Sequence, residues 1–330
     1  MAANPLTTLS TSEGDSARVE DTLLSTVHID GDPYLTEIAS HLIKAGGKRL
    51  RPRFAIGAAA CSIPDGEPVH LDVVRGGVSV EVVHIGSLYH DDVMDDAALR
   101  RQVESVNARW GNLRAILAGD YLLAKASEIA ADLGVEVAGL LATTISHLCQ
   151  GQVGELQTMY DTRRSQDQYF PSIEGKTASL YSAAARIGGI VSGQSRTAVD
   201  SLTEFGRLYG MAFQVVDDIL DVVASDQQLG KPAGNDMLEG VYSLPVIHTL
   251  SSAAGNNLRP LLTEEMSESD RLAAIEVVRN GPGIASAHDA ALGFVNEAKD
   301  VIATVSDNEA AQALAAACDH LLDSVTAVTG

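Results

Sequence analysis

Hydrophobic residues recur at helical spacing through most of this chain, and the pattern predicts a protein built almost entirely of α-helices. The predicted helices cover residues 34–44, 53–61, 71–95, 112–131, 135–158, 173–188, 201–223 and 243–252. Two prolines and a glycine interrupt the pattern at residues 62–70, and a Gly-Pro break follows Arg279. No run of alternating β-branched residues with tight turns predicts a sheet.

The domain organisation follows from the same pattern. Residues 1–20 are polar, and we expect them to be disordered or loosely attached. No linker of convincing length divides the remainder, so we predict a single all-α domain over residues 21–330.

Composition narrows the class of protein. Apolar residues make up 45% and aromatic residues only 4%, which favours helices over sheets. The formal net charge of −21 argues against nucleic acid or an anionic membrane surface as the main partner. Cys61, Cys149 and Cys318 are scattered and match no metal-binding spacing, so we interpret them as reduced core residues. No signal-peptide pattern opens the chain, and no uncharged apolar run reaches the roughly 18 residues of a membrane span. We therefore expect a soluble, cytoplasmic protein.

Two aspartate clusters carry most of the chemical information. HDDVMDD stands at residues 90–96 and DDILD at residues 217–221, and both lie in apolar, helix-patterned segments. On a helix, Asp91 and Asp95 are four residues apart with Asp92 beside them. The second cluster repeats this arrangement with Asp217, Asp218 and Asp221. Like charges at this spacing destabilise a helix, and burial adds to the cost. A fold that carries this penalty twice is expected to bind cations.

The ligand type indicates which cation. Carboxylate oxygens suit Mg²⁺ or Mn²⁺, and Mg²⁺ commonly takes one or two carboxylates together with oxygens of a substrate phosphate. We predict that the two helices hold magnesium and, through it, a diphosphate. The alternative is that the aspartates are solvated helix faces, which the apolar flanks of both clusters disfavour.

Cationic residues gather near the clusters, although Lys and Arg number only 23. Residues 46–53 read GGKRLRPR, and Arg100 and Arg101 would lie about two and a half turns beyond Asp91 if the helix continued. Lys176 and Lys231 add single cations. Both residue types bind phosphate oxygens. Surface solubility or pairing with a nearby aspartate is the alternative, and it is strongest for Lys231.

Together these motifs resemble those of the polyprenyl diphosphate synthases, which elongate trans-isoprenyl chains. The matching segments stand in family order: GGKRLRP (46–52), EVVHIGSLYHDDVMDDAALRR (81–101), GDYLLAKA (119–126), GKTASL (175–180), GMAFQVVDDILD (210–221), LGKPAGND (229–236) and EGVYSLP (239–245). The resemblance implies an isoprenoid-synthase helical bundle around a deep central cavity, usually a homodimer. It implies head-to-tail condensation of isopentenyl diphosphate with an allylic diphosphate. The expected cofactor is a cluster of about three Mg²⁺ ions, which Mn²⁺ can replace.

The resemblance also assigns roles to individual residues. Direct magnesium ligands would be Asp91, Asp95 and Asp217, and their orienting or water-mediated partners would be Asp92, Asp218 and Asp221. The allylic diphosphate would be held by Arg100, Lys176 and Lys231, in a site lined by Thr177 and Gln214. Isopentenyl diphosphate would be held by Lys48, Arg51 and Arg101, with His84 on the same helix face as Asp91. The departing diphosphate would take the final proton.

Two residues depart from the family pattern. Val241 stands where the family usually has a lysine in the segment EGVYSLP, so one cation on the allylic diphosphate is missing or replaced by another group. Gln102 stands where the family usually has glycine after the arginine pair. Neither change removes a metal ligand, so we expect activity.

Product length is expected to depend on the residues about one turn before Asp91. Short-chain enzymes tend to carry a bulky aromatic there, whereas this chain has Gly86 and Ser87. We therefore expect a product longer than geranylgeranyl, in the hepta- to nonaprenyl range and serving a quinone side chain. So lipophilic a product suggests transient membrane contact on release. The alternative for Gly86 is close helix–helix packing.

Other functions remain open at this point. The chain could be a geranylgeranyl or farnesyl diphosphate synthase, or a non-catalytic subunit of a hetero-oligomeric synthase, although all six aspartates are retained. A class I terpene cyclase would normally replace DDILD by an Asn-Ser-Glu type motif and lack GGKRLRP. A structural protein that buffers divalent metal would not explain the clustered cations.

Overall fold

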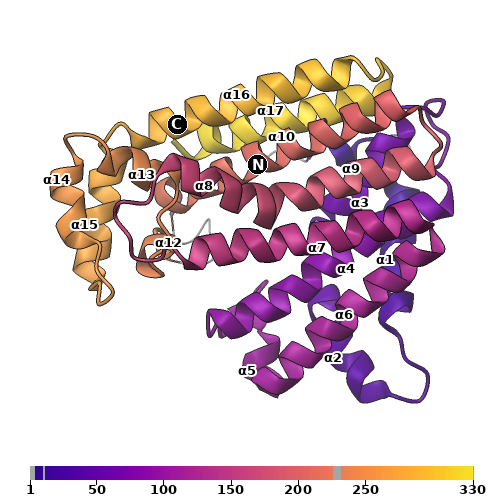
Figure 1. The fold of residues 1–330 in the computed structure, drawn as a ribbon, viewed down its shortest axis with the longest axis horizontal. Helices are drawn as coiled ribbons and strands as arrows, with labels where there is room; N and C mark the ends of the chain where they lie inside the picture. Colours follow the sequence, from indigo (N-terminus) through magenta and orange to yellow (C-terminus); the bar gives the residue numbers. More distant parts are fainter. Residues whose placement is uncertain (1–3, 10–11, 226–231, 330) are drawn as a thin grey trace.

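Helices form nearly all of the regular structure, as the apolar periodicity predicts (Figure 1). The computed structural model describes residues 4–9, 12–225 and 232–329, so Lys231 lies outside the described residues. The helices are α1 (Ser12–Val27), α2 (Pro33–Lys44), α3 (Leu50–Ala60), α4 (Leu71–Met94), α5 (Val106–Trp110), α6 (Asn112–Asp132), α7 (Val135–Leu156), α8 (Gln166–Ile173), α9 (Ser179–Val191), α10 (Arg196–Val223), α12 (Asn235–Leu238), α13 (Leu244–Leu250), α14 (Gly255–Leu258), α15 (Glu268–Arg279), α16 (Gly283–Ala303) and α17 (Glu309–Thr329). Short 3₁₀ turns lie at Pro5–Thr7 and Arg259–Leu261.

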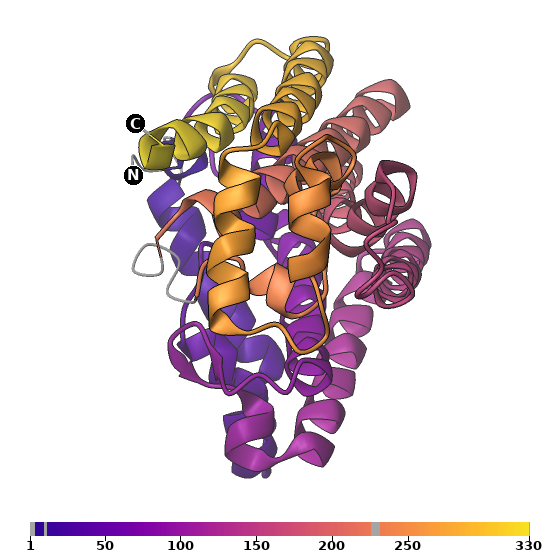
Figure 2. The ribbon, with the colours of Figure 1, turned by 90° about the vertical axis from the view of Figure 1, so that its left-hand side faces the viewer.

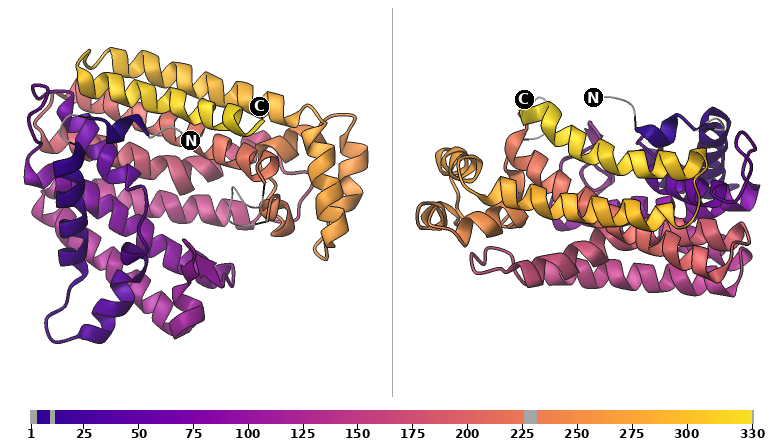
Figure 3. Two further views of the ribbon diagram at one scale, coloured as in Figure 1. Left: turned by 180° about the vertical axis from the view of Figure 1, so that it is seen from behind. Right: turned by 90° about the horizontal axis from the view of Figure 1, so that it is seen from above.

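The long helices enclose the main core, and a smaller group of helices closes one end. In Figure 1, α7, α9, α10 and α16 run along the long axis, while α12 to α15 gather at one end, which faces the viewer in Figure 2. Figure 3 shows α16 and α17 side by side along one edge, where both contact α10. The two aspartate helices share α9 as a neighbour; α4 also packs against α3 and α6, and α10 also packs against α16. A second apolar cluster, which includes Met237, Tyr242 and Ile275, lies under the end group.

The helix that carries the first aspartate cluster ends at Met94, so it does not continue to Arg100 and Arg101. Asp95 caps it, and its N–H donates to the carbonyl of Asp91 at 2.8 Å. The chain then forms a small antiparallel pair, β1 (Leu99–Arg100) with β2 (Val103–Glu104). The predicted helix over residues 71–95 is therefore confirmed, but the condition that it continue to Arg100 is not met, and a short strand pair stands where no sheet was predicted. The turn places Arg101 and Gln102 in left-handed conformations with φ of 51° and 64°.

The N-terminal segment departs from our prediction of a loosely attached stretch over residues 1–20. Within the described ranges, α1 begins at Ser12, and Leu6 and Val19 are 1% and 2% exposed. The reason is a stripe at four-residue spacing, Val19, Leu23 and Val27, which is buried along its whole length.

A π-helical turn at Glu174–Ala178 joins α8 to α9 and carries Lys176 and Thr177. Glycines on both sides let α7 approach this turn closely. A Cβ on Gly151 would lie 2.4 Å from the backbone nitrogen of Lys176, and one on Gly175 would lie 2.5 Å from the carbonyl oxygen of His147. Single π-helical turns within helices are frequent at functional sites.

All three cysteines are free, and Cys61 and Cys318 are buried as expected. Cys149 is exposed on α7, so its interpretation as a core residue is wrong. In the part of the chain that the structure describes, none of the helices has both the length and the apolar character to cross a membrane.

Candidate active site

Four of the six predicted aspartates line one cavity of about 560 Å³ between α4 and α10. Asp91 and Asp95 enter from the first cluster, and Asp217 and Asp218 from the second. Asp92 and Asp221 are 0% and 4% exposed and are not part of the lining. Four of the aspartates thus face the cavity, and the other two lie behind its wall.

The first cluster is tied to the hairpin. Arg100 Nε donates to Asp92 Oδ1 at 2.6 Å, which brings the Arg100 guanidinium to the cavity wall although the helix has ended. Burial raises the pKa of Asp91 to about 6, while nearby Lys176 lowers it and Asp95 raises it. The cavity therefore opposes the charged form of Asp91 unless a cation is bound.

The second cluster is held by a chain of hydrogen bonds. Thr177 Oγ1 donates to Gln214 Oε1 at 2.8 Å, and Gln214 Nε2 donates to Asp218 Oδ1 at 2.8 Å. Tyr169 OH donates to the other oxygen of Asp218 at 2.6 Å. Burial holds the pKa of Asp218 well above its ordinary range, and Asp236 adds to the effect. The two predicted lining residues, Thr177 and Gln214, thus also orient the side chain of Asp218.

The cavity has more acidic than basic side chains. Its described lining contains the carboxylates of Asp91, Asp95, Glu155, Asp217, Asp218, Asp236 and Glu239, against the cations Arg51, Arg100, Arg164 and Lys176. Lys176 Nζ donates to Glu155 Oε1 at 2.5 Å and Arg100 is bonded to Asp92, so two of these cations are already paired. Among the described residues, no three Asp, Glu, His or Cys side chains could hold a metal ion by themselves. Because Mg²⁺ completes its shell with waters and phosphate oxygens, excess carboxylates from two facing helices fit magnesium bound together with a phosphorylated ligand.

A second cavity of about 530 Å³ adjoins the first and has the opposite charge. Its lining includes the predicted residues Lys48, Arg51 and Arg101, together with Arg49, against the single carboxylate of Glu81. Arg51, His84 and Phe213 line both cavities. Burial holds the pKa of His84 well below its ordinary value, and the surrounding arginines lower it further, so His84 is neutral at pH 7.

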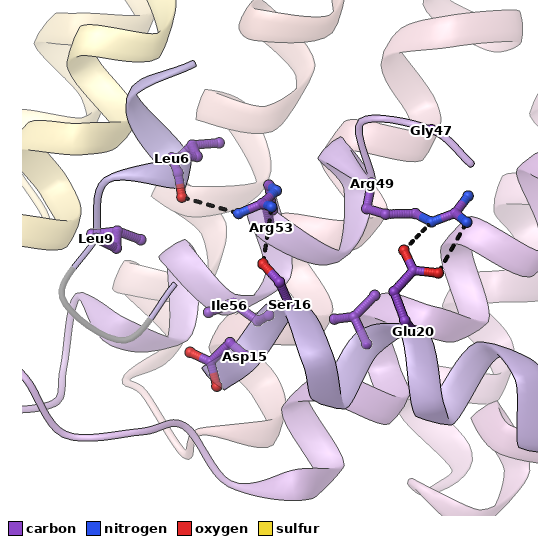
Figure 4. Close-up of a pocket in the computed structure, with 10 residues that line it drawn as sticks. Leu6, Leu9, Asp15, Ser16, Glu20, Gly47, Arg49, Arg53 and Ile56 are labelled. Carbon is purple, nitrogen blue, oxygen red and sulfur yellow. Dashed lines mark hydrogen bonds and ion pairs between the residues drawn. The ribbon is translucent and has the colours of Figure 1, made fainter. Parts of the chain in front are cut away.

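The loop between α2 and α3 that forms the basic cavity is held from α1 (Figure 4). Glu20 accepts hydrogen bonds from Arg49 Nε at 2.7 Å and Nη2 at 3.1 Å, and Arg49 also donates to the carbonyl of Ile43 at 2.8 Å. Gly47 leaves room for the guanidinium of Arg101, because a Cβ there would lie 2.9 Å from Arg101 Nη1. Arg101 donates to the carbonyls of Leu42 and Gly46. Because Gly47 has no side chain, the guanidinium of Arg101 can reach the backbone carbonyl of Gly46.

The two predicted chain-length residues lie in different surroundings. Ser87 lines the acidic cavity. Gly86 faces α6, and a Cβ there would lie 3.2 Å from the carbonyl oxygen of Gly119 and 3.3 Å from Leu122 Cβ. The alternative of close helix–helix packing therefore holds for Gly86.

Several residues of these cavities were not found from the sequence. Glu155 partners Lys176, Tyr169 holds Asp218, and Arg164 lines the acidic cavity. Each stands in a segment without an apparent motif, and nothing in the pair Arg163-Arg164 distinguishes the buried arginine from its exposed neighbour. Lys231, predicted to hold the allylic diphosphate, lies outside the described residues.

Comparison with known proteins shows the family of this chain. Residues 32–278 match the sequence profile of the polyprenyl synthetase family. The chain is 38% identical over 307 residues to nonaprenyl diphosphate synthase of Mycobacterium tuberculosis, covering 92% of this chain and 90% of that protein. It is 36% identical to heptaprenyl diphosphate synthase component 2 of Geobacillus stearothermophilus, covering 90% of this chain and 91% of that protein.

The structural comparison points the same way. A polyprenyl synthase from Caulobacter crescentus, solved in complex with calcium and isoprenyl diphosphate, is similar with a TM-score of 0.89 and 29% identity, covering 97% of each chain. The fold and the family match define an all-α prenyltransferase. The chain belongs to the polyprenyl synthetase family.

Proposed function

We propose that this enzyme condenses isopentenyl diphosphate head-to-tail with an allylic diphosphate in a Mg²⁺-dependent reaction. The observation that carries the proposal is the pair of adjoining cavities, one acidic with both aspartate clusters and one basic, which share Arg51, His84 and Phe213. A metal-bound diphosphate fits the first, and a diphosphate without metal fits the second. Their junction is where the two hydrocarbon portions would meet.

We assign Asp91, Asp95 and Asp217 as direct ligands of a magnesium cluster, with Mn²⁺ as a substitute. Asp92, Asp218 and Asp221 orient them; the bonds of Asp92 to Arg100 and of Asp218 to Tyr169 and Gln214 support this role. When bound, the metal neutralises the departing diphosphate and so assists ionisation of the allylic C–O bond. Arg100 and Lys176 add fixed positive charge beside it.

Isopentenyl diphosphate, the acceptor, is held in the basic cavity. Lys48, Arg51 and Arg101 bind the diphosphate of isopentenyl diphosphate, and neutral His84 lies between the two substrates. Once the allylic C–O bond has ionised, C4 of the isopentenyl C3–C4 double bond attacks the allylic cation and forms the new C–C bond. The positive charge moves to C3, and one proton leaves C2 to form the new double bond. The released diphosphate is the base we propose for that proton.

We propose a product longer than geranylgeranyl. The small side chain of Ser87 in the cavity wall supports this length, as do the names of the nonaprenyl and heptaprenyl relatives. The alternative is a shorter product, because a geranylgeranyl pyrophosphate synthase from Corynebacterium glutamicum has the same fold with a TM-score of 0.82 and 34% identity.

The test is an incubation of the purified chain with Mg²⁺, labelled isopentenyl diphosphate and, separately, geranyl, farnesyl or geranylgeranyl diphosphate. Dephosphorylated products are then sized by chromatography. A ladder beyond geranylgeraniol is the expected result, and a product that stops at or below it contradicts the proposed length only. Asp217→Asn should abolish incorporation, whereas Asp200→Asn, an exposed site on the same helix, should not.

We further propose that the enzyme is a cytoplasmic homodimer that contacts membranes transiently to release its product. Leu113 and Leu117 of α6 are 78% and 65% exposed, and with Ile116 they form an apolar face that a second copy would cover. The relative named as a synthase component raises a second possibility, a partner subunit of different sequence. Incorporation by the purified chain alone would argue against a required partner, and light scattering would give the oligomeric state.

A further inference from the structure

Arg164, in the connection between α7 and α8, is a buried cation whose hydrogen-bonding capacity is mostly unused. Its side chain is 4% exposed. Nη1 donates to the carbonyl of Tyr242 at 3.0 Å, but Nε and Nη2 have no hydrogen-bond partner among the described residues. Leaving charged donors buried without acceptors is costly, so a native protein seldom does so without a ligand or water to accept them.

Arg164 contributes to the wall of the acidic cavity and is connected to the second aspartate cluster. Arg164 lines the cavity together with Lys176 and Asp218. Its guanidinium carbon lies 5.6 Å from the centre of the Tyr169 ring, and the Tyr169 hydroxyl donates to Asp218. Burial lowers the pKa of Arg164, while the neighbouring Glu155, Tyr169 and Asp218 act in the opposite direction, and an arginine so placed remains charged.

The position of Arg164 also bears on the departure at Val241. Val241 lines the same cavity, and Arg164 donates to the carbonyl of the next residue, Tyr242. A cation is therefore present where the chain lacks the lysine expected at position 241. The fork of Arg164 has two donors left over, which matches two oxygens of a diphosphate.

We propose that Arg164 binds the diphosphate of the allylic substrate and replaces the positive charge that is missing at Val241. This inference rests on the proposed function, because the occupant of the acidic cavity is taken to be the metal-bound allylic diphosphate. The competing explanation is that Arg164 only anchors the segment before α13 through its bond to Tyr242.

Arg164→Met tests the proposal, since methionine keeps the apolar contact with Tyr169 and removes the donors. The matched control is Arg163→Met, because Arg163 is 86% exposed and paired only with Asp161 at 2.9 Å among the described residues. Loss of charge-assisted bonds predicts an increase of about 10- to 100-fold in the KM for the allylic substrate. The Kd for inorganic diphosphate with Mg²⁺, measured by calorimetry, should rise similarly. The KM for isopentenyl diphosphate and all constants of the control should stay within about twofold.

Two further measurements separate binding from a structural role. Val241→Lys added to Arg164→Met should restore at least about tenfold of the lost diphosphate affinity. The melting temperature of Arg164→Met without ligands should equal or exceed that of the wild type, because a buried charge with unmet donors has been removed. A lower melting temperature with equal losses for both substrates and no rescue would establish the anchoring role instead.

An unchanged Kd for diphosphate in Arg164→Met overturns the inference whatever the activity. If the wild type elongates no allylic primer, the proposed function fails, and the calorimetric comparison of the two variants still decides the role of Arg164.

Discussion

Replacing Glu20 by Gln should weaken isopentenyl diphosphate binding, although Glu20 does not line the basic cavity. Its carboxylate holds Arg49, which is 5% exposed and lies in a left-handed conformation with φ of 49° (Figure 4). Arg49 follows Lys48 directly and precedes Arg51 by two residues. Loosening Arg49 therefore changes the backbone that presents both predicted ligands.

The magnitude follows from the geometry. Two charge-assisted bonds, at 2.7 and 3.1 Å, would be replaced by one neutral bond. Glu20 is 45% exposed, so water compensates part of the loss, and we expect a decrease of about 1 kcal/mol in the free energy of unfolding. If that energy favours the binding conformation of the loop, the KM for isopentenyl diphosphate rises up to about fivefold. The kcat at saturating substrate should be unchanged.

The assay is steady-state kinetics with each substrate varied in turn, together with denaturant unfolding. Glu37→Gln is the matched control, because Glu37 forms a 3.2 Å ion pair with Arg109 in which both side chains are about half exposed. That pair should contribute less than about 0.5 kcal/mol. A KM that stays constant while stability falls would refute the idea that the Glu20–Arg49 pair positions the loop. A fall in kcat at constant KM would refute it as well.

Three other predictions follow from the same geometry. Ser87→Phe should shorten the longest product seen by chromatography, because Ser87 lines the cavity. Gly86→Ala should leave product length unchanged and lower the free energy of unfolding in urea by about 1 kcal/mol, because the added methyl group would contact α6. A shorter product from Gly86→Ala and an unchanged product from Ser87→Phe would contradict this assignment. Gln102→Gly should raise the free energy of unfolding by up to about 1 kcal/mol because φ is 64°, and a decrease would argue against strain in the turn. Asp91→Asn should stop Mg²⁺-dependent turnover yet raise the melting temperature of the metal-free protein above pH 6. Burial raises the pKa of Asp91 to about 6, so the folded state binds more protons than the unfolded state between about pH 4 and 6. The folded state therefore loses stability as pH rises through that window, by on the order of 3 kcal/mol. A melting temperature for Asp91→Asn equal to that of the wild type at pH 8 would contradict this reasoning.

The helical character and most helix positions were predictable from the sequence. Helix formation depends on local periodicity and on breaks such as residues 62–70, so the predicted helices at residues 34–44 and 112–131 agree closely with α2 and α6. The N-terminal helix was missed because its stripe of Val19, Leu23 and Val27 stands among polar residues, although the four-residue spacing was present.

The neighbourhood of the aspartates was less predictable. The sequence located the end of the helix near Asp95 but not the path of the chain beyond it, where a hairpin returns Arg100 to Asp92. The turn is stabilised by contacts with residues far along the chain, as in the bonds of Arg101 to Leu42 and Gly46.

The sequence by itself determined the class of fold, the two aspartate clusters and the cationic loop, because each of these is a local pattern of residue types. Only the tertiary structure decided which side chains face the same space. It separated Ser87 from its neighbour Gly86, and the buried Arg164 from the exposed Arg163. Adjacent residues on a chain point in different directions, and whether a direction leads to a cavity, a helix or solvent depends on segments that the local sequence does not contain.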